Sequence, residues 1–311
     1  MIPLAETEHF AGPPEWTWYI LFYFFLAGLA GGAYLYATLL RHWGKPADEP
    51  AARLGFYVAF VALIICPILL TLDLKSPLRF WHMLVNTTPG GFGLNFVYRS
   101  PMSVGVWALV VASLFALVSF LDTLVRDGKL GFGPARRLSA VLDGGAGRVW
   151  DVIGAALCIF VASYTGVLLA VSNQPVWSDT WALGGLFLAS GLSGSAALLI
   201  LLMRYRPEAE ASRGFLEIGE RLFAALELLL LVVFALTLID DGTLDEAFGM
   251  PWLLLWLVAV AGILPGLIGL VRSGLRLRPG GTARMPVWAV PVLLLAGVLA
   301  LRAAVIFSAQ A

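Results

Sequence analysis

The sequence contains eight continuous apolar stretches, each about as long as the hydrocarbon layer of a membrane requires. They lie near residues 18–40, 54–73, 101–124, 151–172, 181–203, 220–239, 251–271 and 287–307. A helix of about 20 apolar residues crosses roughly 30 Å of hydrocarbon, and 60% of the chain is hydrophobic while only 13% is charged. Membrane β-strands would instead alternate over about ten residues. The sequence therefore predicts an all-α integral membrane protein with eight transmembrane helices.

The positive charges predict how these helices are oriented. Sixteen of the 20 Lys and Arg residues follow the first, third, fifth and seventh stretches, and the other face holds only Lys75, Arg79, Arg99 and Arg302. Because positively charged loops stay in the cytoplasm, we expect both termini to be extracytoplasmic. Residues 1–17 lack a positive segment, so they are interpreted as an extracytoplasmic tail rather than a cleaved signal peptide. The net charge of zero argues against a nucleic-acid partner.

Small residues favour a division of the protein into two halves. The first stretch contains AGLAGGAYLYA with Gly28 and Gly32, and the fifth contains ASGLSGSAA. Small residues let membrane helices approach closely, so a packing role is predicted for both segments. Their placement favours two four-helix bundles, residues 18–172 and 173–311, although the halves show no clear sequence repeat.

Histidine and cysteine are too few, and in the wrong places, for a prosthetic group. A membrane haem needs paired axial ligands inside the bilayer, whereas His9, His42 and His82 fall in tails, loops or interfaces. Neither Cys66 nor Cys158 is part of a CxxC motif, and both are interpreted as small buried hydrophobic residues. The protein is therefore predicted to hold neither haem nor an iron–sulfur cluster, and no metal.

The longest segment on the outer face, residues 74–100, begins with a cluster of charge. TLDLKSPLRFWH brings together Asp73, Lys75, Arg79, Trp81 and His82 within ten residues. The run PLRFWHMLV predicts a helix lying at the membrane interface, and long ordered loops are often functional. The alternative is that this aromatic and basic segment only anchors the protein at the lipid headgroups.

Polar residues of the fourth stretch are predicted to lie at a depth close to that of Asp73. Tyr164 falls in the outer half of this stretch, and its polar neighbours are Ser163, Thr165 and Asn173. An isolated tyrosine would be interpreted as an aromatic-belt residue. An acid, a phenol and hydrogen-bond donors beside apolar walls, however, match what a quinone headgroup needs for hydrogen bonding and proton exchange.

Three further ionisable residues lie within or near the predicted spans. Glu227 either belongs to a proton path or pairs with a base such as Arg221, and Asp122 is expected to snorkel to the inner surface. Arg302 either pairs with an outer acid or reaches the headgroups. Whether Glu227, Asp122 and Arg302 form a proton route is left open by the sequence.

Five motifs in order resemble the NrfD/polysulfide reductase membrane-subunit family. They are WTWYILFYFFLAGLAGGAYL, LDLKSPLRFWHML, SPMSVGVW, YTGVLLAVSNQPVWSDT and FLASGLSGSAALL, within residues 16–200. The resemblance implies an eight-helix quinone-reactive anchor without a prosthetic group, in the bacterial inner membrane. It also implies an extracytoplasmic four-cluster iron–sulfur subunit and, usually, a molybdopterin catalytic subunit as partners. The quinone pocket is expected within the first four helices, near the outer face.

The resemblance assigns candidate roles to residues already singled out. The family's acid and tyrosine match Asp73 and Tyr164, the expected catalytic pair. The sequence departs from the family pattern at three places. Lys75-Ser76 stands where Gly-Arg is commoner in the family, and Tyr23 stands where some relatives carry a histidine. Residues 87–97 look like an insertion.

The predicted function is quinol oxidation or quinone reduction, with menaquinone or ubiquinone. Asp73 would exchange protons, and other residues would contact the headgroup or dock the iron–sulfur subunit: Tyr23, Lys75, Arg79, Trp81, His82, Ser163, Thr165 and Asn173. Two alternatives stay open. A secondary transporter would have helix breaks at matching positions of its two halves, which Pro67 and Pro265 do not occupy. The other is a redox-inactive scaffold subunit of an electron-transfer complex.

Overall fold

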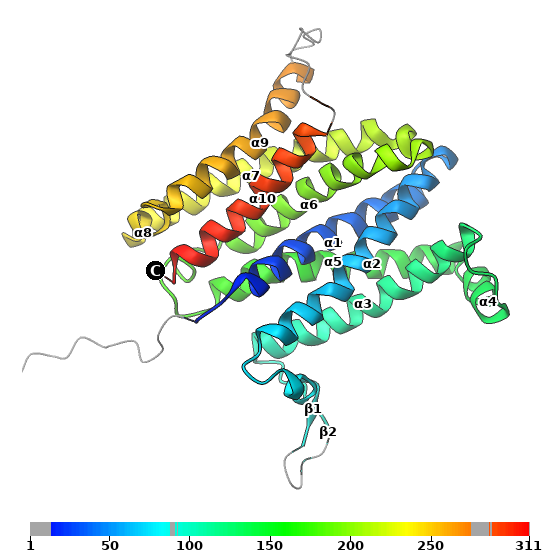
Figure 1. Cartoon of the computed structure of the whole chain (residues 1–311), viewed down its shortest axis with the longest axis horizontal. Helices are drawn as coiled ribbons and strands as arrows, with labels where there is room; N and C mark the ends of the chain where they lie inside the picture. Colours follow the sequence, from blue (N-terminus) through cyan, green and yellow to red (C-terminus); the bar gives the residue numbers. More distant parts are fainter. Residues whose placement is uncertain (1–13, 88–90, 92, 275–285, 287, 311) are drawn as a thin grey trace, which may run out of the picture.

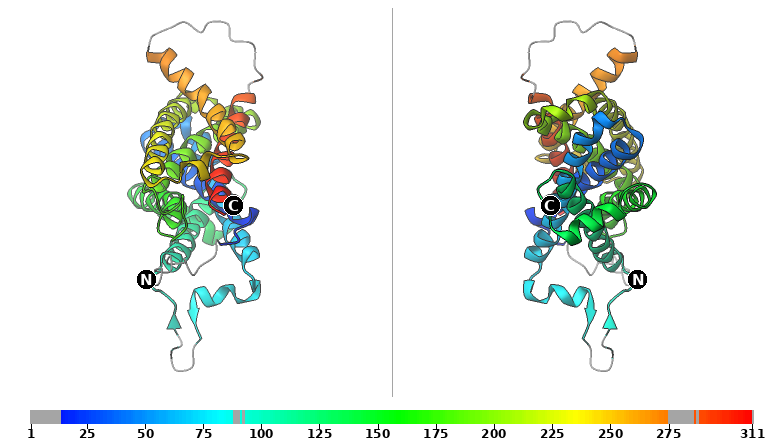
Figure 2. Two further views of the ribbon diagram at one scale, coloured as in Figure 1. Left: turned by 90° about the vertical axis from the view of Figure 1, so that its left-hand side faces the viewer. Right: turned by 90° about the vertical axis from the view of Figure 1, so that its right-hand side faces the viewer.

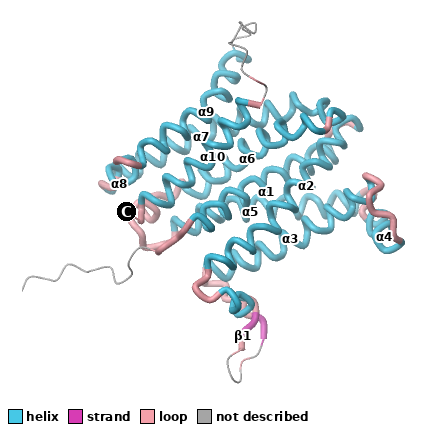
Figure 3. The backbone as a smooth tube through the Cα atoms, viewed as in Figure 1, coloured by secondary structure: helices cyan, strands magenta, loops and turns pink. Residues whose placement is uncertain are grey.

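The computed structural model describes residues 14–87, 91, 93–274, 286 and 288–310. Within these residues, eight helices are long and apolar enough to cross a membrane, as predicted (Figure 1). They are α1 (Trp18–Trp43), α2 (Glu49–Asp73), α3 (Pro101–Arg126), α5 (Gly145–Ala170), α6 (Leu183–Leu202), α7 (Arg213–Asp241), α9 (Trp252–Gly274) and α10 (Ala289–Ser308). Helices account for most of the fold, as Figure 3 shows.

The shorter elements connect these helices. They are η1 (Pro46–Asp48), η2 (Pro77–Met83), η3 (Met203–Tyr205), η4 (Pro207–Ser212), α4 (Gly133–Val141), α8 (Leu244–Phe248), β1 (Val85–Asn86) and β2 (Gly93–Leu94). Strands β1 and β2 pair antiparallel in the segment between α2 and α3, and this hairpin projects from the helical body (Figure 2). We call the end at which α1 begins and α2 ends the outer end, following the predicted orientation, and the opposite end the inner end.

The first four long helices lie on one side of the molecule and the last four on the other (Figure 1). Helix α1 packs against α2, α5 and α6, and α6 packs against α5, α7 and α10. The contact between the two sides is therefore formed mainly by α1 and α5 on one side and α6 on the other. A Cβ added at Gly191 of α6 would lie 2.9 Å from the Cα of Gly28, which only a glycine pair allows. The predicted packing role of the small residues is thus confirmed, whereas the division at residue 172 stays a prediction.

Several helices begin earlier than the hydropathy predicts. Helix α2 begins at Glu49 instead of 54, α5 at Gly145 instead of 151, and α7 at Arg213 instead of 220. The inner segment 125–150, between α3 and α5, contains the short helix α4. Three of the sixteen Lys and Arg residues used to predict the orientation, Arg276, Arg278 and Arg284, lie outside the described residues.

Candidate functional site

A cavity of about 410 Å³ lies at the outer end, between α1, α2, α3 and α5. Its walls are almost entirely apolar, and its volume falls within the range of about 300–1,000 Å³ that is usual for small-molecule sites. The lining residues are Trp16, Ile20, Tyr23, Phe24, Pro67, Leu70, Thr71, Asp73, Leu74, Phe80, Met83, Leu84, Met102, Gly105, Val106, Leu109, Val110, Tyr164 and Leu168. Three of the residues singled out in the sequence, Tyr23, Asp73 and Tyr164, therefore share one cavity.

Asp73 is held in place by the residue that caps α1. The hydroxyl of Thr17 donates to Asp73 Oδ1 at 2.7 Å and accepts from the backbone N–H of Tyr19 at 3.3 Å. This pair ties the beginning of α1 to the end of α2, because Asp73 is the last residue of that helix. The carboxylate is half-buried, so it faces the cavity while keeping access to the outer solution.

Tyr164 reaches the cavity from α5 and binds to the beginning of α3. Its hydroxyl donates to the carbonyl oxygen of Pro101, and its ring stacks on Phe160 with centroids 5.9 Å apart. One turn into α3, a Cβ at Gly105 would collide with the Tyr164 ring. Gly105 therefore provides the space that the phenol occupies.

Trp16, which lies just before α1 in the segment interpreted as an N-terminal tail, forms part of the cavity wall. The Trp16 ring stacks on Trp177 with centroids 5.0 Å apart, and its backbone N–H donates to Gln310 Oε1 at 2.7 Å. Trp177 in turn donates to the carbonyl oxygen of Val305 in α10 at 2.6 Å. These contacts fix the segment before α1 against the end of α10.

The charged and aromatic residues predicted beside Asp73 do not line this cavity. Lys75, Arg79, Trp81 and His82 are all exposed. Instead, their apolar neighbours Phe80, Met83 and Leu84 face the cavity. The predicted interfacial helix is the short 3₁₀ helix η2, and within it the Trp81 and His82 rings contact each other with centroids 4.0 Å apart.

The polar neighbours of Tyr164 also lie away from the cavity. The Ser163 hydroxyl donates to the carbonyl oxygen of Gly184 in α6 at 3.2 Å, and Thr165 donates to the carbonyl oxygen of Ala162 in its own helix at 2.8 Å. Asn173 is exposed beyond the end of α5. Of the polar groups predicted in this stretch, only Tyr164 lines the cavity.

The family model described as polysulphide reductase, NrfD matches residues 6–311. The protein belongs to this family. A polysulfide reductase polypeptide of Wolinella succinogenes is 32% identical over 199 residues, which cover 60% of the present sequence and 58% of that protein. A selenate reductase polypeptide of Mesobacillus selenatarsenatis is 26% identical over 86% of the present sequence and 69% of its own length. Protein NrfD of Escherichia coli is 27% identical over 81% of the present sequence and 83% of its own length.

Membership of the NrfD family and the eight apolar helices make this a multi-pass bacterial inner-membrane protein. The predicted recognition and location are thus confirmed. The alignment with the Wolinella succinogenes relative spans 58% of that protein's length.

A buried arginine joins three helices of this NrfD-family protein. Arg302 of α10 is fully buried and donates to Ser190 at 2.9 Å and to the carbonyl oxygens of Phe187 at 3.0 Å and Phe24 at 3.3 Å. The guanidinium also lies over the Phe187 ring, 5.1 Å from its centroid. Arg302 was expected to pair with an outer acid or to reach the headgroups, and both expectations are wrong.

Glu227 is buried in α7 near this arginine. Its Oε2 accepts from the Ser193 hydroxyl at 2.9 Å, and it interacts electrostatically with Arg302. Of the two expected alternatives, an interaction with a base is thus present, but the base is Arg302 rather than Arg221, which donates to Glu217 at 3.1 Å. Glu227 and Arg302 are therefore neighbouring buried charges inside the helical body.

Asp122 belongs to a buried ionic cluster at the inner end instead of snorkelling to the surface. It accepts from Arg41 at 3.0 Å and from Arg126 at 2.8 Å. Asp151 extends the cluster by accepting from Ser119 at 2.9 Å and by contacting His42 Nε2 at 2.8 Å. Arg41, His42 and Asp151 were not singled out in the sequence, because they fall at the ends of the predicted spans.

Proposed function

We propose that this protein is the membrane subunit of a respiratory oxidoreductase, and that it oxidises quinol, or reduces quinone, in the outer cavity. The observation that supports this proposal is the cavity itself, in which one carboxylate and two phenols interrupt an apolar wall. A quinone is a flat apolar ring with two oxygens, so it matches aromatic and aliphatic walls with a few polar groups.

Quinol oxidation releases two electrons and two protons, and each residue would contribute to one part of this reaction. The Asp73 carboxylate would accept the two quinol protons one after the other, and it would pass the first to the outer solution before it takes up the second. The Tyr164 oxygen, whose own proton is donated to Pro101, accepts a hydrogen bond from the headgroup. Tyr23 and the apolar walls position the ring and exclude water. In the reverse direction, Asp73 would deliver the two protons in turn.

The electrons would pass between the quinone and an extracytoplasmic iron–sulfur subunit. That subunit would in turn exchange them with a molybdopterin catalytic subunit. The relatives from Wolinella succinogenes and Mesobacillus selenatarsenatis are named as parts of a polysulfide reductase and a selenate reductase, which supports such an assembly. The exposed side chains of Lys75, Arg79, Trp81 and His82 are accessible to a partner above the membrane. We propose that they form part of the docking surface, rather than the headgroup site.

The assembly can be tested by purification from the native membrane in mild detergent. We expect iron and broad iron–sulfur absorbance to copurify with the protein. Adding a quinol should bleach that absorbance, or adding a quinone should restore it in a reduced sample. Parallel samples with a naphthoquinol and with decylubiquinol would identify the quinone class. An iron-free protein that binds no quinone analogue would favour a transporter.

Asp73 provides the sharper test of the site. We expect Asp73→Asn to slow the quinol-linked absorbance change at least about a hundredfold, because a general base contributes about 10² to 10⁴ in rate. Asp240→Asn, which removes an exposed carboxylate at the outer end of α7, is the matched control and should change little. Unaltered kinetics in Asp73→Asn, with iron still bound, would remove Asp73 from the mechanism. If iron copurifies but quinol changes the absorbance of neither the wild type nor the variants, the redox-inactive scaffold alternative gains support.

A further inference from the structure

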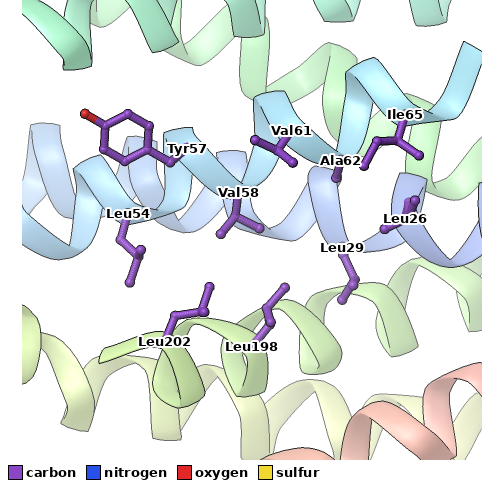
Figure 4. Close-up of a pocket in the computed structure, with 10 residues that line it drawn as sticks. All are labelled: Leu26, Leu29, Leu54, Tyr57, Val58, Val61, Ala62, Ile65, Leu198 and Leu202. Carbon is purple, nitrogen blue, oxygen red and sulfur yellow. The ribbon is translucent and has the colours of Figure 1, made fainter. Parts of the chain in front are cut away.

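A second apolar hollow, of about 340 Å³, lies between α2 and α6 with α1 behind it (Figure 4). We call it the α2–α6 groove. Its walls include Leu26, Leu54, Val58, Val61, Ile65 and Leu198, and it shares no lining residue with the outer cavity. Val61 is about half exposed, so the groove opens toward the lipid side of the helices. Such a surface suits a flexible hydrocarbon tail.

The inner end of the groove carries excess positive charge. Asp127, which follows α3, accepts from Arg53 at 3.0 Å, from Arg206 at 3.2 Å and from Lys129 at 3.3 Å. Burial alone would raise the pKa of Asp127, but its hydrogen-bond donors outweigh burial and hold the pKa at about 2. Three cations therefore surround one ionised carboxylate. In the described structure, Arg53 alone among the three also pairs with a second acid, Glu49, at 3.1 Å.

Tyr57 connects the cations to the apolar walls. Its side chain lines the groove (Figure 4), and its hydroxyl donates to Asp127 Oδ2 at 2.7 Å. The ammonium of Lys129 and the guanidinium of Arg206 lie 4.9 Å and 5.2 Å from the Tyr57 ring centroid. The apolar hollow and the positive cluster thus form one continuous surface.

We propose that the α2–α6 groove binds an acyl tail of an anionic phospholipid, whose phosphate lies against Lys129 and Arg206. Basic pockets between transmembrane helices on the cytoplasmic side are suited to anionic headgroups, and the predicted orientation places this end in the cytoplasmic leaflet. A quinone headgroup fits poorly, because Tyr57 is the sole polar residue among those that line the groove in the described structure, and no lining carboxylate could take up the protons of a quinol. The proposal does not depend on the quinone site.

The test compares lipids on the full-length protein in detergent by native mass spectrometry. We expect dioleoyl phosphatidylglycerol to be retained at least about fivefold better than dioleoyl phosphatidylcholine, because each nearby cation adds about that factor in affinity. Lys129→Gln should reduce the retention of phosphatidylglycerol by about fivefold. Its control is Arg137→Gln, which removes an exposed inner-end charge outside this cluster.

A second pair of variants tests the groove itself. Val61→Trp fills the hollow from its open side and should reduce the retention of both lipids. Ile64→Trp changes a similarly exposed residue of α2 that does not line the groove, so it should have no effect. Equal retention of the two lipids, or equal effects within each pair of variants, would overturn the proposal. Displacement of the lipid by a full-length menaquinone would instead assign the groove to a quinone tail.

Discussion

Gly105 determines whether the Tyr164 phenol can lie in the outer cavity. A methyl group at this position would collide with the phenol ring, so Gly105→Ala should move the ring while keeping the hydroxyl. We expect the affinity for 2,3-dimethyl-1,4-naphthoquinone to fall at least about tenfold, because misplacement by about 1 Å can cost up to 10²-fold in function. Binding can be measured by tryptophan quenching.

Gly214→Ala is the matched control for this substitution, because a Cβ at Gly214 meets nothing within 4 Å. Its affinity for the naphthoquinone should equal that of the wild type. If Gly105→Ala binds as tightly as Gly214→Ala, the position of the Tyr164 phenol does not matter for binding.

Single residues show how far the sequence can predict a site in a membrane protein. Asp73 and Tyr164 are recognisable because polar groups are rare among apolar stretches, whereas Tyr23 is singled out only through the resemblance to the family; the three share one cavity. Thr17 and Gly105 are not recognisable, because the first acts through a contact with a residue 56 positions away and the second through the absence of a side chain. Such contacts depend on how helices pack, which hydropathy does not describe.

At the scale of helices, hydropathy predicted the number of spans but placed the beginning of three of them too late. Helices α2, α5 and α7 extend through charged residues that the apolar pattern excludes. In α2 and α7 charges near the beginning are paired locally: Glu49 accepts from Arg53 at 3.1 Å, and Glu217 accepts from Arg221 at 3.1 Å, each pair one turn apart. In α5 the Arg148 guanidinium instead lies over the Trp43 ring, 5.8 Å from its centroid. Pairing lets a helix carry charge beyond its apolar core, so a boundary drawn at the first charge comes too late.

The contact between α1 and α6 gives a prediction at this scale. Gly191→Ala should lower the melting temperature in detergent, because the new Cβ would lie about 2.9 Å from the backbone of Gly28. Overpacking of this kind typically costs about 1–3 kcal/mol. Gly185→Ala on the same helix is the control, since its Cβ meets only the end of the Leu230 side chain, at 3.3 Å. Equal melting temperatures in the two variants would show that α1 and α6 can separate without cost.

Across the whole molecule, the three acids singled out in the sequence lie in three separate regions. Asp73 lies at the outer cavity, Asp122 belongs to the inner cluster, and Glu227 lies beside Arg302 within the other half of the protein. Buried charges in a membrane protein are costly, and they are functional candidates by default. Arg302 and Asp122 each have several hydrogen-bond or ion-pair partners that explain their burial. Glu227 has only the Ser193 hydroxyl as a hydrogen-bond partner in the described structure.

We therefore expect Glu227, rather than Asp122 or Arg302, to carry protons if quinol turnover is coupled to translocation. In liposomes containing the complete complex and an internal pH dye, Glu227→Gln should abolish proton movement while quinol-linked electron transfer stays within about twofold, because the residue lies outside the quinone cavity. Glu217→Gln on the same helix is the control, since Glu217 is partly exposed and paired with Arg221. If the Glu227→Gln complex moves protons as fast as the wild-type complex, this role is refuted. It is also refuted if the wild-type complex moves no protons. Loss of electron transfer together with proton movement would instead show that Glu227 supports the quinone site through the contact between α1 and α6.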